Sequence, residues 1–152
     1  MRLDPVLVDR LRTHGLRVTA PRVAVLSVLE GEGHHADALS IAAMARRQCG
    51  NLSIQAVYDN LNALVDAGLV RRIQPSGHTA RYEPQRHDNH HHIVCRHCGA
   101  TEDVACAVGH VPCLEPVHDH GYVVDEAEVI YWGLCPRCQG PDPNPIQEKP
   151  KP

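Results

Sequence analysis

Apolar side chains recur at helical spacing along the first part of the chain, and this pattern predicts a series of short helices. The first helix can end at Gly15, because glycine readily adopts the left-handed conformation that closes a helix. Thr19 is the expected cap of a second helix, which has Pro21 in its first turn and stops at the glycines of segment 31–33.

A third helix is expected over about residues 36–48, and Ser53 is the expected cap of a fourth helix, residues 53–66. The apolar positions of the fourth helix form one stripe: Ala56, Val57, Leu61, Leu64 and Val65. Segments 69–74 and 79–83 then alternate like the two strands of a hairpin. Helices followed by such a hairpin are typical of a winged helix-turn-helix, whose fourth segment enters the major groove of DNA. A small helical domain with an incidental hairpin is the alternative.

The second part of the chain has a different pattern, with short alternating runs typical of strands. Strands are expected at 92–95, 101–105 and 122–134, with one short helix near 111–119. The Pro-rich, polar end of the chain has the composition of a disordered tail. The sequence therefore predicts an α+β protein with a winged-helix domain at 1–83, a small α/β metal-binding domain at 84–139 and a tail at 140–152.

Charge is divided unevenly between these parts. Residues 1–82 carry ten Arg and seven acidic residues, a net of +3, whereas residues 83–152 carry five basic and eleven acidic residues, a net of −6. The first part suits phosphate and the second suits cations. No apolar run approaches the ~18 residues that span a bilayer, and the N-terminus does not resemble a signal peptide. We therefore expect a cytoplasmic protein without a membrane partner, in which the seven Cys serve metal or redox chemistry rather than disulfides.

Two C-x-x-C pairs are the strongest chemical signal in the sequence. Cys95 and Cys98 form the first pair, and Cys135 and Cys138 form the second. Four soft thiolates on two short loops are the tetrahedral environment of structural zinc, here joining two distant strands. A thioredoxin-type redox pair is the alternative, but such a pair normally occurs once, at the start of a helix. The remaining cysteines are expected to be buried or incidental: Cys49, Cys106 and Cys113.

A second group of metal ligands is expected around the run of histidines that precedes Cys95. In a strand, His90 and His92 point to the same face. Glu83 and Asp103 are the nearest carboxylates, and His35 offers a nitrogen from the first part of the chain. Such a mixed nitrogen and oxygen set suits Fe(II), Mn(II), Zn(II) or Ni(II), and the spacing does not choose among them. A His-rich surface loop is the alternative.

Several stretches together resemble the ferric uptake regulator (Fur) family over about residues 6–138. They are Gly15–Arg22, Ala56–Leu61, Ala67–Val70, Ala80–Glu83, His90–Cys95 and Gly133–Cys135. The stretches Asp88–Cys95 and Asp125–Gly133 look most similar to the FurA branch, whose members typically repress a neighbouring catalase-peroxidase gene. The resemblance implies a homodimeric, metal-dependent repressor, with iron as the first regulatory metal, whose C-terminal α/β domain dimerises and whose winged helix binds operator DNA.

The resemblance also assigns the candidate sites. It places structural zinc on Cys95, Cys98, Cys135 and Cys138, and a regulatory divalent metal on His35, Glu83, His90, His92 and Asp103. His34 is a possible substitute for His35. The DNA-contacting positions of the family fall on Arg17, Arg22 and Tyr58, with both arginines expected to contact phosphate.

Two positions depart from the patterns of particular family members. Asp59 stands where many iron regulators have Arg, which indicates a different operator sequence. Glu83 stands where peroxide-sensing members have Asp, which leaves peroxide, zinc and nickel sensing open as alternatives. A zinc hydrolase and a metal store are rivals from other classes. The first is disfavoured because no H-E-x-x-H motif occurs and a four-cysteine site is closed, and the second leaves the basic winged helix without a purpose.

Overall fold

The computed structural model describes residues 4–31, 35–86, 88, 90–106, 114–125 and 127–140 of the chain. The chain forms two compact units, residues 1–88 and residues 89–152. The boundary predicted from the sequence lies between residues 83 and 84. Among the described residues, no helix is long and apolar enough to cross a membrane. The predictions for His34, Cys113 and the tail beyond residue 140 lie outside the described ranges.

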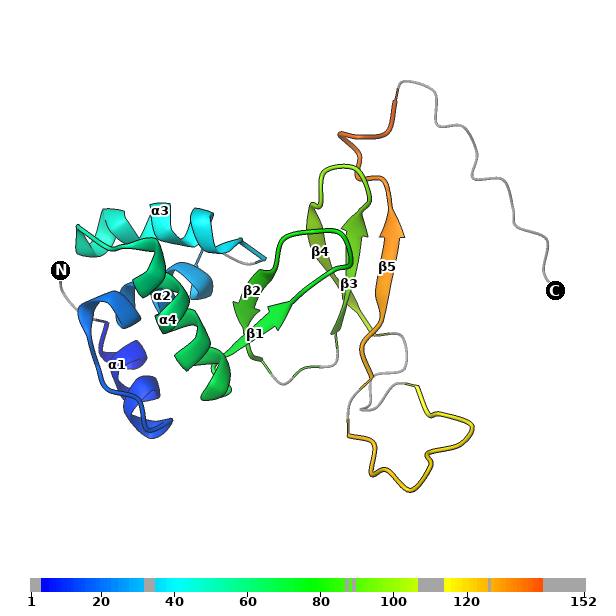
Figure 1. The fold of residues 1–152 in the computed structure, drawn as a ribbon, viewed down its shortest axis with the longest axis horizontal. Coiled ribbons are helices and arrows are strands. Elements are labelled where there is room, and N and C mark those ends of the chain that lie inside the picture. The colour runs from blue at the N-terminus through cyan, green and yellow to red at the C-terminus, as the bar shows by residue number, and fades with distance from the viewer. Residues whose placement is uncertain are drawn as a thin grey trace. The chain divides into compact units, whose positions relative to one another are not determined.

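The first unit is a winged helix, with the elements in the predicted order. Its helices are α1 (Pro5–Thr13), α2 (Ala20–Glu30), α3 (Ala38–Cys49) and α4 (Ile54–Asp66), and they precede the antiparallel hairpin of β1 (Val70–Ile73) and β2 (Arg81–Pro84) (Figure 1). The apolar stripes seen in the sequence face one another in a single helical core. Its fully enclosed side chains include Leu11, Leu26, Leu29, Ile41, Leu61 and Leu64.

Short polar side chains define where the helices begin. The hydroxyl of Thr19 accepts from the backbone N–H of Arg22 at 3.4 Å, and that of Ser53 accepts from Ala56 at 3.1 Å, so both predicted caps are confirmed. The third helix starts two residues later than expected. Asp37 caps it by accepting from the Ser40 N–H at 2.7 Å, and that bond lowers the pKa of the Asp37 carboxyl.

A glycine turns the chain from α4 into the hairpin. Gly68 has a φ of +70°, which a side chain would strain. Its N–H donates to the carbonyl of Val65, and the Leu69 N–H donates to that of Leu64, both at 2.9 Å. These two hydrogen bonds end the helix, and Leu69 is buried in the core. Strand β1 begins at the next residue, Val70.

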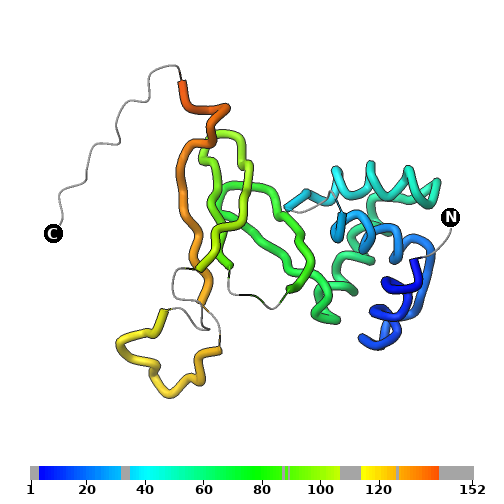
Figure 2. Tube along the Cα trace, turned by 180° about the vertical axis from the view of Figure 1, so that it is seen from behind, coloured from blue at the N-terminus to red at the C-terminus, as the bar shows by residue number. Residues whose placement is uncertain are grey.

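The second unit is a three-stranded sheet in the order β4-β3-β5. The central strand β3 (His90–Cys95) pairs antiparallel with β4 (Thr101–Ala105) and parallel with β5 (Ile130–Gly133). The long strand expected over 122–134 is therefore wrong in extent, because only four of its described residues, Ile130–Gly133, pair with β3. The described part of the expected helix, 114–119, is not helical. In Figure 2 the segment 114–125 lies at the end of the sheet where β5 begins.

Candidate metal centres and nucleic-acid interface

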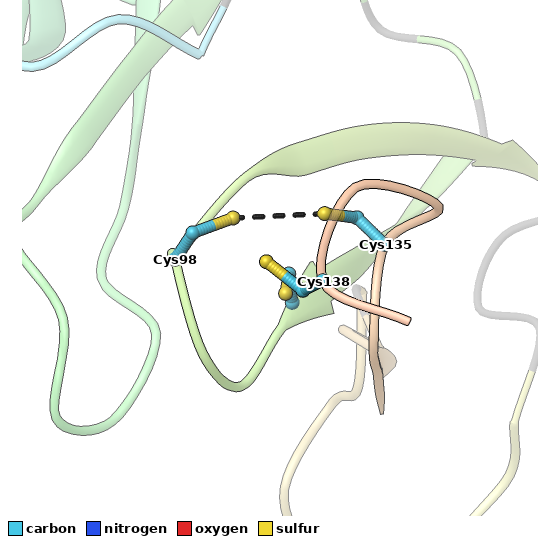
Figure 3. Close-up of side chains that lie close together, drawn as sticks. Cys98, Cys135 and Cys138 are labelled. Carbon is cyan, nitrogen blue, oxygen red and sulfur yellow. Dashed lines mark hydrogen bonds between the residues drawn. The ribbon is translucent and has the colours of Figure 1, made fainter. Parts of the chain in front are cut away.

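The parallel pairing of β3 and β5 brings the two C-x-x-C loops together. Because both strands run in one direction, the loops that follow them leave from the same end of the sheet. The four sulfur atoms of Cys95, Cys98, Cys135 and Cys138 all lie within 4.8 Å of one another. Figure 3 shows Cys98 and Cys138 with Cys135, whose Sγ is 3.7 Å from that of Cys98. Four sulfurs at 2.3 Å from a tetrahedral zinc ion would lie about 3.8 Å apart, so the cluster has the size for zinc.

Backbone hydrogen bonds prepare this cluster for a cation. Hydrogen bonds from the backbone N–H groups of Cys135 and Cys98 lower the pKa of the Cys95 thiol to about 5, which favours its thiolate form. The hydrogen bond between the Cys138 and Cys135 side chains raises the pKa of Cys138 to about 12. Zinc binds thiolates, so its binding to this cluster would release the protons that the remaining thiols carry.

The first unit contains a buried pair of potential metal ligands. Nε2 of His35 lies 2.8 Å from a carboxylate oxygen of Glu83, and the two residues are 8% and 3% exposed. His35 has a φ of +57°, an uncommon left-handed conformation for a residue with a side chain. Arg81 fixes this backbone by donating to the His35 carbonyl at 3.0 Å, and the Tyr82 N–H donates to the carbonyl of Ala36. The ligand pair is thus attached to the wing strand β2.

The second unit contains a second group of nitrogen and oxygen donors. Asp103 lies directly opposite His92 in the β3–β4 register, and the sheet alternation puts His90 on the same face. An oxygen of Asp103 lies 3.6 Å from Nε2 of His90 and 3.7 Å from Nε2 of His92. His92 is completely buried, and its ring is nearly perpendicular to that of His90. Imidazole nitrogens beside a carboxylate suit a borderline divalent metal.

The exposed face of α4 carries the candidate DNA-reading residues. Tyr58 is 40% exposed, and the other exposed side chains of this helix include Gln55, Asp59 and Asn62. Gln55 donates to the Asp59 carboxylate at 2.9 Å, one helical turn away. Arg17 is exposed in the loop before α2. The other predicted contact, Arg22, is half-buried and bonded within the protein.

Two residues that shape these sites were missed by sequence reasoning. Arg81 holds the backbone of His35, and Asn60 accepts from the Arg22 side chain on the inner face of α4. A polar residue at position 60 interrupts the helical apolar stripe between Val57 and Leu61, and this interruption was the available signal. The role of Arg81 left no such signal, because its acceptor is a backbone carbonyl 46 residues away in the chain.

Comparison with known proteins identifies the family. The model of the ferric uptake regulator family matches residues 13–131, which include parts of both units. The chain belongs to this family. It is 57% identical over 134 residues to the transcriptional regulator FurA of Mycobacterium tuberculosis, with 88% of this chain and 90% of that protein aligned.

Solved structures of Fur proteins have the same fold. The Pseudomonas aeruginosa ferric uptake regulator, solved with manganese, matches with a TM-score of 0.70 and 27% identity over 86% of this chain and 98% of its own. The Helicobacter pylori Fur, described as having three functional metal binding sites, matches with a TM-score of 0.69 and 25% identity over 91% and 97% of the two chains.

These findings confirm three predictions from the sequence: the Fur family, the resemblance to FurA, and the α+β organisation with an N-terminal winged helix. The protein is therefore a transcriptional regulator of the Fur family. The relatives are named as regulators, which favours this class over a zinc hydrolase or a metal store.

Proposed function

We propose that this chain is a metal-dependent transcriptional repressor that binds operator DNA as a homodimer. Among the candidate regulatory metals we propose Fe(II). The observation that carries the proposal is that each unit holds its own group of potential metal ligands, His35 with Glu83 in the first and His90, His92 and Asp103 in the second. The first group is bonded to the wing of a DNA-binding fold. Binding operator DNA would place the protein in the cytoplasm.

The four-cysteine cluster is proposed to hold structural zinc. Its sulfur spacing and its closed set of thiolates support this role, because catalytic zinc keeps an open position for water. Zinc there would join the ends of β3 and β5. It would contribute directly to the folding of the second unit.

The regulatory site is proposed to use His35, Glu83, His90, His92 and Asp103 as ligands of one divalent ion. Three imidazoles and two carboxylates form a mixed set that suits Fe(II), and the family membership favours iron. Shared coordination would restrict the angles between the two units. A larger fraction of the protein would then be competent to bind DNA, and the apparent affinity for DNA would rise in proportion to that fraction.

The DNA contacts are proposed to come from α4 and the loop before α2. Tyr58 would touch a base, most favourably a thymine methyl group, and Arg17 would contact phosphate. A dimer of such units requires an inverted-repeat operator, because the two-fold symmetry of the protein is mirrored in its site. Ile93 and Tyr131 are neighbours on one face of the sheet and are 42% and 48% exposed, which supports burial of this face in a homodimer.

The target genes are proposed to be those of iron or oxidative-stress control, including a catalase-peroxidase, on the strength of the similarity to FurA. The same ligands also suit a zinc or nickel sensor. If Fe(II) is bound at this site, peroxide could oxidise one of its histidine ligands, His35 or His90. Peroxide sensing is therefore the alternative within the family.

The test is DNA binding by the purified dimer with Fe(II), Mn(II), Zn(II) or Ni(II), on DNA from upstream of the chain's own gene and of a neighbouring catalase-peroxidase gene. His90→Ala should abolish the metal-dependent gain in affinity while leaving the zinc content and the dimer intact. His118→Ala removes an exposed histidine outside the proposed set and should behave like the unsubstituted protein. A normal metal response in His90→Ala would exclude the proposed regulatory site.

A further inference from the structure

Arg22 joins two elements of the DNA-binding unit through different nitrogens of one side chain. It is the third residue of α2, and its Nε donates to Oδ1 of Asn60 on α4 at 3.2 Å. Its Nη1 donates to the backbone carbonyl of Arg17, in the loop before α2, at 2.8 Å. A guanidinium is rigid and planar, so these two bonds fix the positions of the two acceptors relative to each other.

Asn60 is the residue of α4 that accepts the hydrogen bond from Arg22. It is 9% exposed and lies among the enclosed side chains Val57, Leu61 and Leu64. Its Nδ2 donates to the Ala56 carbonyl at 2.7 Å, which leaves Oδ1 as the atom that faces Arg22. Asn60 lies two positions from Tyr58, and two residues span about 200° of an α-helix, so the two side chains occupy nearly opposite faces.

The other bond of Arg22 holds the peptide that carries Arg17. Arg17 is exposed, and its side chain is proposed to contact phosphate. The same guanidinium therefore holds both the loop of Arg17 and the helix of Tyr58. Both hydrogen bonds form in the absence of DNA, because Arg17, Arg22 and Asn60 all belong to the first unit.

We propose that Arg22 is a positioning residue for DNA recognition: it sets the spacing between the Arg17 loop and α4, and does not act mainly as a phosphate contact. The inference rests on the proposed DNA-binding function. A phosphate contact, which the sequence predicts for Arg22, needs only a positive charge, whereas the positioning role needs the two-nitrogen geometry of a guanidinium. Lysine keeps the charge and loses that geometry.

The experiment compares Arg22→Lys and Arg22→Ala with Arg17→Ala in the metal-loaded, full-length dimer, measuring operator affinity over a range of salt concentrations. We expect Arg22→Lys to weaken binding at least about tenfold, as Arg22→Ala does, because a charge-assisted hydrogen bond is lost in each protomer. Neither should change the salt dependence. Arg17→Ala should reduce the slope of log K against log salt by about 0.9 for each lost phosphate contact, hence about 1.8 for the dimer.

Asn60→Leu is a second variant that tests the same link from the other side. Leucine suits the helix and the surrounding core, and residue 60 lies on the inner face of α4. Loss of operator affinity in a normally folded Asn60→Leu protein, checked by thermal melting and zinc content, would support positioning. A third measurement needs no DNA: the amide NMR signals of α4 should shift in Arg22→Lys and stay in place in Arg17→Ala.

The opposite results would overturn the inference. Arg22→Lys with unsubstituted affinity, together with Arg22→Ala reducing the salt slope by about 1.8, would make Arg22 a phosphate contact. Unchanged α4 signals in Arg22→Lys would by themselves exclude the positioning role. Failure of the unsubstituted protein to bind DNA with every metal would instead overturn the proposed function and, with it, this inference.

Discussion

The two units of the chain are stabilised in different ways. Among the described residues, twenty of the buried hydrophobic residues belong to the first unit, whereas Val94 and Cys95 are those of the second. The other buried side chains of the described part of the second unit are polar: His91, His92 and Thr101. The first unit therefore rests on a conventional apolar core, and the second has little apolar burial to hold three short strands together.

This difference indicates why the cysteine cluster lies where it does. Sheet pairing holds β3 to β5 over four residues, and the four sulfurs gather at the end of that pairing, where Cys95 is paired with Gly133. A metal bound at this end of the sheet would add stability that the two apolar residues buried in the described part of this unit do not supply. The predictions below separate the two modes of stabilisation, beginning with the largest effect.

Replacing Cys138 with Ser should release zinc and unfold the second unit while the first stays folded. Structural zinc binds with an apparent free energy of about 10–16 kcal/mol, as much as or more than the whole stability of a typical domain. The single Trp of the chain, Trp132, lies beneath the guanidinium of Arg96 in the first cysteine loop, so its fluorescence should report the loss. Zinc content and helical circular dichroism complete the measurement.

Cys49→Ser is the matched control, because Cys49 ends α3 in the other unit, and it should keep its zinc. A zinc-free Cys138→Ser protein that is as stable and as fully dimeric as the original would refute the structural role of the cluster.

Replacing Leu61 with Ala should have the converse effect. Leu61 is completely buried in the helical core, and truncating such a side chain costs about 2–5 kcal/mol. The helical unfolding transition should move to lower denaturant concentration with zinc content unchanged. Leu39→Ala, at a position 69% exposed, should leave the transition nearly where it was. If Leu61→Ala lost zinc in proportion to its lost helix stability, the two units would not be independently stabilised.

The smallest expected effect concerns one helix start. Ser53→Ala removes the hydroxyl that accepts from the Ala56 N–H and should destabilise the first unit by about 1 kcal/mol. Ser53→Asp keeps an acceptor at the same position and should retain the original stability in the same denaturation experiment. Equal losses in both variants would mean that Ser53 acts through something other than its cap.

Local chemistry made much of the first unit predictable. The hydroxyls of Thr19 and Ser53 cap helices through bonds to residues only three positions away, and such bonds can be anticipated from the sequence. The start of α3 was less predictable, because Ala36 pairs with Tyr82 on a distant strand and Asp37 takes the cap. The extent of β5 was also set at long range: Tyr122 and Val123 have strand propensity, but among the described residues of 122–134 only Ile130–Gly133 pair with β3.

By itself, the sequence determined the ligand types, the starts of α2 and α4, the resemblance to the family and the division into a basic helical part and an acidic strand-rich part. These follow from residue chemistry and from spacings of a few positions. The tertiary structure alone decided that parallel pairing of β3 with β5 gathers the four sulfurs, that Arg81 holds His35, and that Arg22 bonds to Asn60. Each of these joins residues at least 37 positions apart in the chain. Such partners are chosen by the packing of whole elements, which no local pattern encodes.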